Sequence, residues 1–318
     1  MTNKVCLVIF FNHRYEKNIP KLYKYYAYRF DSIKIIMPFY KDPSDSRVLR
    51  VYGNSWHFQD YFRQAYQELV EEKAAYYIFV GDDCLLNPVI NQENIINLLR
   101  LHSDSNFISD IQPLAPLSLS WKNFTEEKIG FSTPGVEYFK ELPGKELALR
   151  QIKKHKIFSE MQDEQFLVYQ SLSKFCERAK NDFESLIYHL FKQKVRLPLK
   201  LFPKVTRELK FPLLKGYSDF LIVNKDSLEE FVHLCGIYSS MHMFAEIAIP
   251  TALALSCNNL VTLEDTQFQA KAYWSDFRKT DLEELKKQLN GDVSKLFEGE
   301  RNNYLWIHPI KFSIWEIN

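Results

Sequence analysis

Two adjacent acids, Asp82 and Asp83, directly follow an apolar run at 75–80 and a single glycine, Gly81. An apolar run of this length and composition, bounded by polar residues, is typical of a buried strand. Acids at the end of a strand are held in place, and carboxylate oxygens are the ligands that hard divalent cations prefer. We therefore interpret the pair as a site for a metal ion that neutralises a diphosphate. The alternative is a turn in which the acids cap the next element.

A third acid, Glu246, lies inside the apolar run 244–249. Burying a lone carboxylate is costly, so we expect Glu246 to have either a partner or a chemical role. The simplest partner is a backbone amide or an arginine. His242 precedes Glu246 by four residues, and the two would share a face if both lie on one helix.

The elements that position these acids are predicted from the hydrophobic pattern. The predicted strands cover 5–11, 33–37, 75–80, 107–111 and 220–223, and the tail 304–315 is also strand-like. The predicted helices cover 17–30, 56–73, 91–102, 226–234 and 280–289, the last two opening with capping-box patterns. Strands that alternate with helices predict an α/β fold with a mostly parallel sheet flanked by helices. Ligands bind such sheets at the carboxyl ends of the strands, which is where Asp82 and Asp83 fall.

Composition narrows the class of protein. The chain has 318 residues and a net charge of +1, which argues against a nucleic-acid-binding protein. Its five cysteines are scattered, with no Cys-x-x-Cys pair, so neither a disulfide framework nor a zinc knuckle is expected. The short apolar start at 5–11 does not resemble a secretory signal, and no run is long enough for a membrane span. We therefore expect a cytoplasmic protein.

We expect a single domain over 1–318, with a helical and basic insertion over 145–215. Within it, 192–215 holds eight lysines and arginines against one acid, with leucines and phenylalanines between them. Such a segment can dock on an anionic membrane, which would place the protein peripherally at the inner face. The alternative is a solvated loop whose leucines pack on the core.

The run 76–88, with its two acids, resembles the metal-binding motif of bacterial GT-A glycosyltransferases, especially those that assemble surface polysaccharides such as capsule, O-antigen and lipooligosaccharide. In that family an apolar strand ends in Asp-x-Asp, and the acid followed by two apolar residues usually touches the metal. The resemblance implies Asp83 as the ligand, with Asp82 facing the ribose or hydrogen-bonded to the ligands. Because this chain has Gly81-Asp82-Asp83 instead, either acid remains a candidate for the direct ligand.

The resemblance extends towards both ends of the chain. The family's first strand ends against the nucleotide, and here Phe11, Asn12 and His13 occupy that position. The Asn12 amide suits the edge of a base such as uracil, although it would equally cap the following helix. His308 and Lys311 resemble the family's C-terminal pair, in which a histidine reaches the metal and a cation reaches the diphosphate. The alternative for His308 is a surface loop.

For the acceptor, the resemblance implies an acid near Glu246 that contacts or deprotonates a sugar hydroxyl. Asp219 is a second candidate, with closure of a turn before a strand as its alternative. The implied function is a hexosyltransferase-like, Mn²⁺- or Mg²⁺-dependent transfer from a nucleotide sugar, most simply a UDP-sugar, to a glycan or lipid-linked acceptor.

Two rival functions remain. A nucleotidyltransferase of sugar metabolism also uses a metal and an α/β sheet, but it tends to carry a glycine-rich basic loop after the first strand. Here that place is taken by Asn12-His13-Arg14-Tyr15. A non-catalytic glycan-binding module of the same fold is the other rival, and the acids together with His308 argue against it.

Overall fold

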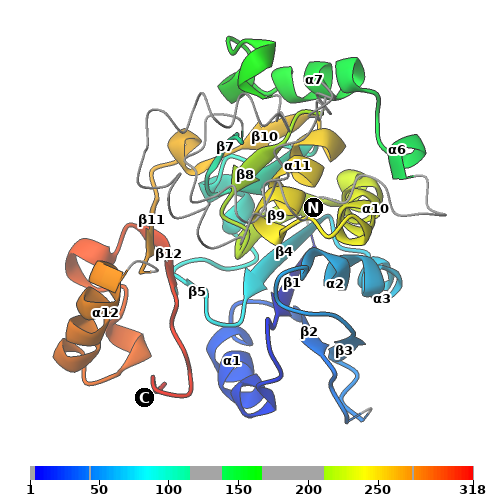
Figure 1. The fold of residues 1–318 in the computed structure, drawn as a ribbon. Coiled ribbons are helices and arrows are strands. Elements are labelled where there is room, and N and C mark those ends of the chain that lie inside the picture. The colour runs from blue at the N-terminus through cyan, green and yellow to red at the C-terminus, as the bar shows by residue number, and fades with distance from the viewer. Residues whose placement is uncertain (1–3, 43, 115–137, 167–210, 274–275, 318) are drawn as a thin grey trace, which may run out of the picture.

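A seven-stranded sheet forms the centre of the computed structural model, which describes residues 4–42, 44–114, 138–166, 211–273 and 276–317 (Figure 1). Its strands, in spatial order, are β10 (Asn259–Val261), β6 (Ser105–Ile108), β9 (Phe220–Asn224), β4 (Tyr76–Gly81), β1 (Val5–Phe10), β2 (Ser32–Pro38) and β3 (Val48–Val51). Strand β9 is antiparallel to both of its neighbours, and every other pair in this sheet is parallel. The prediction of an α/β fold with a mostly parallel sheet is confirmed.

Strand β1 is the point at which the strand order reverses. Strands β2 and β3 follow on one side of β1, and the chain then crosses to place β4 on the other side. In open α/β sheets the ligand crevice lies outside the carboxyl ends of the strands at such a switch point. Residues 11–13 follow β1 at this edge, and Asp82 and Asp83 follow β4.

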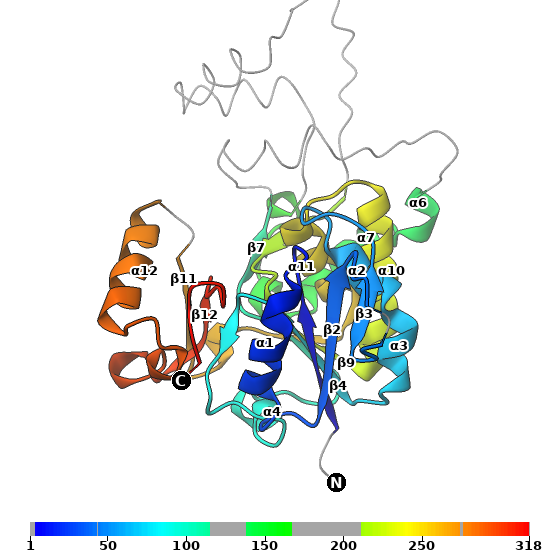
Figure 2. The same ribbon diagram turned by 90° about the horizontal axis from the view of Figure 1, so that it is seen from below.

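Alternate side chains of the strands supply two separate cores. In β1, Cys6, Val8 and Phe10 face one core, and Leu7 and Ile9 face the other. The first core is covered by α2 (Gln59–Gln64), α3 (Tyr66–Glu71), α7 (Lys145–Lys153), α10 (Lys225–Ser240) and α11 (Ala245–Ser256). The second is covered by α1 (Ile19–Tyr26), α4 (Ile95–Leu98) and the C-terminal segment with α12 (Asp276–Gln288). Figure 2 shows α1 apart from α2, α3 and α10 across the strands.

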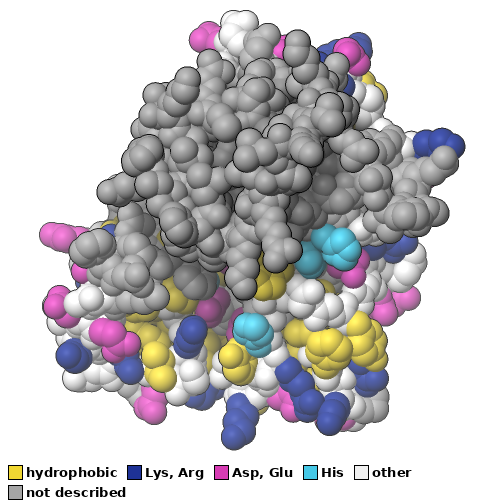
Figure 3. Space-filling view, viewed as in Figure 1, with side chains coloured by type: hydrophobic (Ala, Val, Ile, Leu, Met, Phe, Trp, Pro, Cys, Tyr) yellow, Lys and Arg dark blue, Asp and Glu magenta, His cyan; other side chains and the backbone are white. Residues whose placement is uncertain are grey.

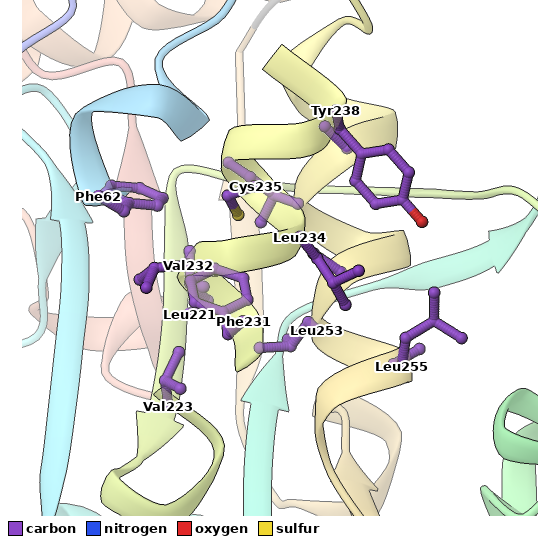
Figure 4. Close-up of a cluster of buried hydrophobic side chains, with 14 of the residues drawn as sticks. Phe62, Leu221, Val223, Phe231, Val232, Leu234, Cys235, Tyr238, Leu253 and Leu255 are labelled. Carbon is purple, nitrogen blue, oxygen red and sulfur yellow. The ribbon is translucent and has the colours of Figure 1, made fainter. Parts of the chain in front are cut away.

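The first core fixes the helix that carries Glu246. Phe231 and Val232 of α10 pack near Leu221 of β9 and Phe62 of α2, and Leu253 of α11 lies beside them (Figure 4). Truncating one such buried side chain to alanine typically costs about 2–5 kcal/mol. Helix α11 is therefore a rigid support for the residues at its N-terminus.

Two small sheets complete the described fold. In one, β12 (Tyr304–His308) lies between β11 (Gln269–Ala272) and β5 (Leu85–Leu86), so the C-terminal segment packs beside the residues that follow Asp82 and Asp83. In the other, β7 (Ile111–Pro113) pairs with β8 (Leu214–Gly216). A short helix, α6 (Tyr138–Glu141), precedes α7.

Several element boundaries differ from the predicted ones. The helix predicted at 56–73 is divided at Ala65, where the backbone (φ −87°, ψ 0°) departs from regular helical values. The helix predicted at 91–102 is reduced to α4, because Arg100 adopts the left-handed conformation (φ 56°) that commonly ends helices. The strand predicted at 107–111 becomes β6 and β7, and the strand-like tail is limited to β12.

The insertion predicted at 145–215 is described only in part. Its first portion forms α7 and its last residues belong to β8, whereas 167–210, with most of the basic segment, lies outside the described residues. Among the helices that the structure describes, none has both the length and the apolar character needed to cross a lipid bilayer.

Candidate active site

Residues from four parts of the chain meet at the carboxyl edge of β4. Asp82 and Asp83 follow β4 directly, and Asp219 precedes β9. Because β9 is antiparallel to β4, its first residue lies beside the last residues of β4, and the Gly81 amide donates to the Asp219 carbonyl at 2.8 Å. Glu246, in the first turn of α11, interacts electrostatically with both Asp219 and His308.

His308 and Asp83 form the closest side-chain pair in this group. The Nε2 atom of His308 lies 3.0 Å from Oδ1 of Asp83. The backbone supports the pairing, because the Ile310 amide donates to the Asp83 carbonyl at 2.7 Å. The His308 side chain is fully buried at the end of β12, so the surface-loop alternative for this residue is wrong.

The charges of the pair follow from its surroundings. Burial raises the pKa of Asp83, but His308 and then Lys311 outweigh burial, so the net pKa is lowered. Burial lowers the pKa of His308, but Asp219 and Asp83 oppose it, and the net pKa is raised. Without a metal these shifts favour the charged form of each partner, and a cation bound by His308 Nε2 would take the place of the proton on that nitrogen.

The other three acids are pushed towards their protonated forms. Burial, followed by repulsion from Asp83, raises the pKa of Asp82 well above its ordinary value. Burial raises the pKa of Asp219 to about 6. Burial and then the charge of Asp219 raise the pKa of Glu246 to about 7. The cluster holds more acids than His308 and Lys311 neutralise, which favours a bound cation.

Two aromatic residues without a predicted role hold His308 in place. The ring of Tyr217 stacks on Trp306, with centroids 4.3 Å apart and planes 7° from parallel, and meets the imidazole edge-on at 5.7 Å. Trp306 Nε1 donates to the Ser109 hydroxyl at 2.8 Å. The Tyr217 hydroxyl is buried beside Asp219 and accepts or donates no hydrogen bond within the described residues. Strand periodicity offered a signal, since Trp306 shares a face with His308.

The residues predicted after β1 have different positions. Phe11 is fully buried in the second core, so its side chain does not face the edge. The backbone N–H of Asn12 donates to the Asp82 carboxylate, and the side-chain Oδ1 atom of Asn12 is buried with no hydrogen-bond partner in the described part of the chain. No side-chain cap from Asn12 is present at the 3-10 turn Glu16–Asn18 or at α1. The side chain of His13 is exposed.

His242 does not share a helix face with Glu246. Helix α10 ends at Ser240 and α11 begins at Ala245, and His242 lies between them with a φ of 57°. The four-residue spacing therefore reflects a turn between two helices. Besides burial, the groups that shift the pKa of Glu246 are Asp219, His308, Lys215 and Asp110.

The donor atoms fit a metal ion that takes part of its coordination from a ligand. In the described residues, no three His, Cys, Asp or Glu side chains are close enough together to hold a metal on their own. Asp83 and His308 nevertheless offer an oxygen and a nitrogen 3.0 Å apart. Two neighbouring ligands at right angles, each about 2.1 Å from a cation, are about 3 Å apart. Mg²⁺ in particular is commonly bound through one or two side chains plus substrate phosphates.

Comparison with known proteins identifies no relative. No protein-family model matches the chain, and no curated protein matches it. The fold and the site together define an α/β protein with a buried acidic cluster at the topological switch point of its sheet. The function is therefore inferred from these side chains and from the resemblance of the Asp82 and Asp83 motif.

Proposed function

We propose that the chain is a metal-dependent glycosyltransferase of the GT-A type. It would transfer a sugar from a nucleotide sugar, with a UDP-sugar as the expected donor, to a glycan or lipid-linked acceptor in the cytoplasm. The observation that supports this most is the pairing of His308 with Asp83 at the carboxyl end of β4. Nucleotide sugars present a diphosphate, and a cation held by this pair is suited to bind it.

On the donor side, Asp83 and His308 would hold Mn²⁺ or Mg²⁺. The metal, when bound, supplies neutralisation of the departing diphosphate. Lys311 follows on the same segment, is exposed and lowers the pKa of Asp83, so its charge reaches the same region. Asp82 accepts from the backbone N–H of Asn12, and these two residues are the candidates for hydrogen bonds to the ribose and base.

On the acceptor side, Glu246 is the best candidate for the base. Its pKa of about 7 is close to that of an efficient general base at neutral pH. The carboxylate would accept the proton of the attacking hydroxyl as the new glycosidic bond forms. Asp219, with a pKa of about 6, is the next candidate, because it interacts electrostatically with Glu246, His308 and Asp83.

The rival functions make different demands on the same edge. A nucleotidyltransferase needs close contact between phosphates and a glycine-rich loop, and residues 11–15 after β1 contain no glycine. A glycan-binding module needs no base and no metal pair. The buried Asp83 and His308 pair and the raised pKa of Glu246 favour catalysis.

A thermal-shift series tests the proposal. Melting temperature is measured with UDP, GDP or CDP, each with Mn²⁺ or with EDTA, because a ligand of the native state raises stability. We expect UDP with Mn²⁺ to raise the melting temperature, and UDP with EDTA to have little effect. Hydrolysis of UDP-sugars that requires Mn²⁺ would then separate an enzyme from a binding module. A chain whose melting temperature responds to no nucleotide diphosphate in the presence of Mn²⁺ would contradict the proposal.

A further inference from the structure

Four aromatic side chains lie around the acidic edge of the sheet, and we call them the aromatic rim: Phe39, Tyr52, Trp56 and Phe244. Phe39 follows β2, Tyr52 follows β3, Trp56 precedes α2, and Phe244 directly precedes α11. The first three are 52%, 56% and 50% exposed, and Phe244 is partly buried. In the space-filling view, hydrophobic side chains gather over β2 and β3, near histidine side chains (Figure 3).

The rim consists of two ring pairs. Phe39 meets Tyr52 edge-on, with centroids 5.7 Å apart, and Trp56 meets Phe244 at a tilt, with centroids 5.4 Å apart. Phe39, Tyr52 and Trp56 each keep about half of their surface exposed. Large aromatic rings that are half exposed and adjacent to a candidate site are typical of ligand contacts.

The backbone beneath the rim is fixed by side-chain hydrogen bonds. The Gln64 amide accepts from the Tyr52 N–H at 2.8 Å and donates to the Tyr52 carbonyl at 2.6 Å. The Trp56 N–H donates to Asn54 Oδ1 at 3.0 Å, and the Ala245 N–H donates to the Trp56 carbonyl at 3.1 Å. A surface held in this way loses little conformational freedom when a ligand binds.

Phe39 is held at the surface by an unusual backbone conformation. Its φ of 57° is a left-handed conformation that is rare for a bulky residue. The conformation is maintained by the bond from the Phe39 N–H to the Val51 carbonyl at 2.9 Å. Strained positions that hold a side chain in solvent are concentrated at ligand-binding sites.

The rim is close to Glu246 along the chain, and the metal pair includes a residue from a different part of the fold. Phe244 is two residues before Glu246, and both belong with the helices that cover the first core. His308 belongs to β12, which packs in the second core. We therefore expect a ligand on the rim to reach the acids beside the start of α11, whereas a diphosphate would lie beside the segment that carries His308 and Lys311.

We propose that the aromatic rim binds the pyranose rings of the acceptor glycan, which rests on the glycosyltransferase function proposed above. Sugar rings carry apolar C–H faces that pack on aromatic rings, and their hydroxyls remain free to bond with water or polar neighbours. His57 and His242, whose rings are 5.7 Å apart, lie next to Trp56 and Phe244 and supply polar groups at this surface. A glycan laid across the rim would direct a terminal hydroxyl towards Glu246.

The test uses the intact chain on an array of bacterial and mammalian surface glycans, with three matched variants. Trp56→Leu keeps an apolar side chain but loses the aromatic face, and Trp56→Phe keeps the face. Tyr28→Leu is the control. Tyr28 is 71% exposed and follows the C-terminal end of α1, whereas the residues that follow β1 precede the N-terminal end of that helix. We expect Trp56→Leu to lose about tenfold or more in glycan affinity, with Trp56→Phe and Tyr28→Leu close to the unmodified chain.

The UDP and Mn²⁺ thermal shift, measured on the same four proteins, separates the two proposals. Glycan binding that depends on Trp56 supports the rim even if UDP with Mn²⁺ has no effect, a result that would contradict the glycosyltransferase function alone. No bound glycan, or equal binding by Trp56→Leu, overturns the rim proposal. Loss of the UDP shift in Trp56→Leu with glycan binding intact also overturns it, because the rim would then hold the nucleobase.

Discussion

The imidazole of His308 pairs with the carboxylate of Asp83 at 3.0 Å although the two residues are 225 positions apart. Strand β12 brings them together by pairing with β5 (Leu85–Leu86), which begins two residues after Asp83. The same short sheet that covers the second core therefore also completes the candidate metal site.

We predict that Asp83→Asn removes Mn²⁺-dependent binding of UDP. The amide keeps the shape of the side chain but loses the negative charge that attracts the cation. Isothermal titration with UDP in the presence of Mn²⁺ measures the effect, and circular dichroism checks that the fold survives. Unchanged affinity in a folded variant would exclude Asp83 as a ligand and leave Asp82 to be tested.

Replacing His308 by alanine should weaken Mn²⁺ binding, whereas Lys311→Ala should weaken binding of the nucleotide and leave Mn²⁺ alone largely unaffected. The difference follows from position, since His308 is buried beside Asp83 and Lys311 is exposed. Loss of a residue that only hydrogen-bonds to a metal ligand typically costs about 10–100-fold in metal affinity, and we expect at least that for His308 as a direct ligand. Mn²⁺ affinity followed by paramagnetic relaxation of water protons compares the two variants. Equal Mn²⁺ affinity in both would contradict the assignment.

Glu246→Gln should slow sugar transfer by about 10²–10⁴-fold and leave donor affinity nearly unchanged. The amide retains the size of the side chain but cannot accept a proton. The measurement is the single-turnover transfer rate together with the UDP-sugar affinity of the same protein. Near-normal turnover per folded molecule would remove Glu246 from the mechanism and make Asp219 the next acid to replace.

The same substitution should change how stability depends on pH. The folded-state pKa of Glu246 is about 7, raised from an ordinary value of 4.5. A raised pKa means that the folded state binds the proton more tightly, so the stability associated with it is complete below pH 4.5 and is lost as pH rises through 7.

As pH rises from 5 to 8, we therefore expect the unfolding free energy of Glu246→Gln to increase by on the order of 2 kcal/mol relative to that of the unmodified chain. Urea unfolding in EDTA at several pH values measures this difference, with metal excluded because a cation would lower the pKa. Parallel profiles of unfolding free energy against pH for the two proteins would contradict a raised pKa of Glu246 in the folded chain.

Removing the hydroxyl of Tyr217 should not destabilise the fold. Tyr217→Phe keeps the stack on Trp306 and removes a buried polar atom that has no hydrogen-bond partner in the described residues. We expect a gain of about 1 kcal/mol in unfolding free energy, and a loss of substrate affinity if the hydroxyl bonds to the ligand. Urea unfolding and UDP-sugar titration give the two values. A large loss of stability would indicate a bond that the hydroxyl makes within the protein.

The sequence allowed the fold class and the edge of the sheet to be predicted, because both depend on local pattern. The apolar run before Asp82 and Asp83 identified a buried strand and its carboxyl end. The approach of Asp219 and His308 could not be predicted in the same way, since it depends on the antiparallel direction of β9 and on the pairing of β12 with β5. These are long-range choices that no local pattern encodes.

The structure differs from one expectation that came from the resemblance and from one arrangement that was conditional on a shared helix. Phe11 continues the alternation of β1 and therefore points into the second core with Leu7 and Ile9. His242 and Glu246 have helical spacing, but the left-handed backbone at His242 separates two helices. In both cases one backbone detail decided the direction of a side chain.

The place of His308 in the chain has a consequence for synthesis. A nascent chain releases Asp82, Asp83, Asp219 and Glu246 from the ribosome well before it releases the imidazole that opposes their charge. Until β12 pairs with β5, Asp83 lacks the imidazole that lies beside it in the folded chain. Binding of the proposed metal is therefore coupled to the final strand pairing, because the ion would take one ligand from each of the two segments.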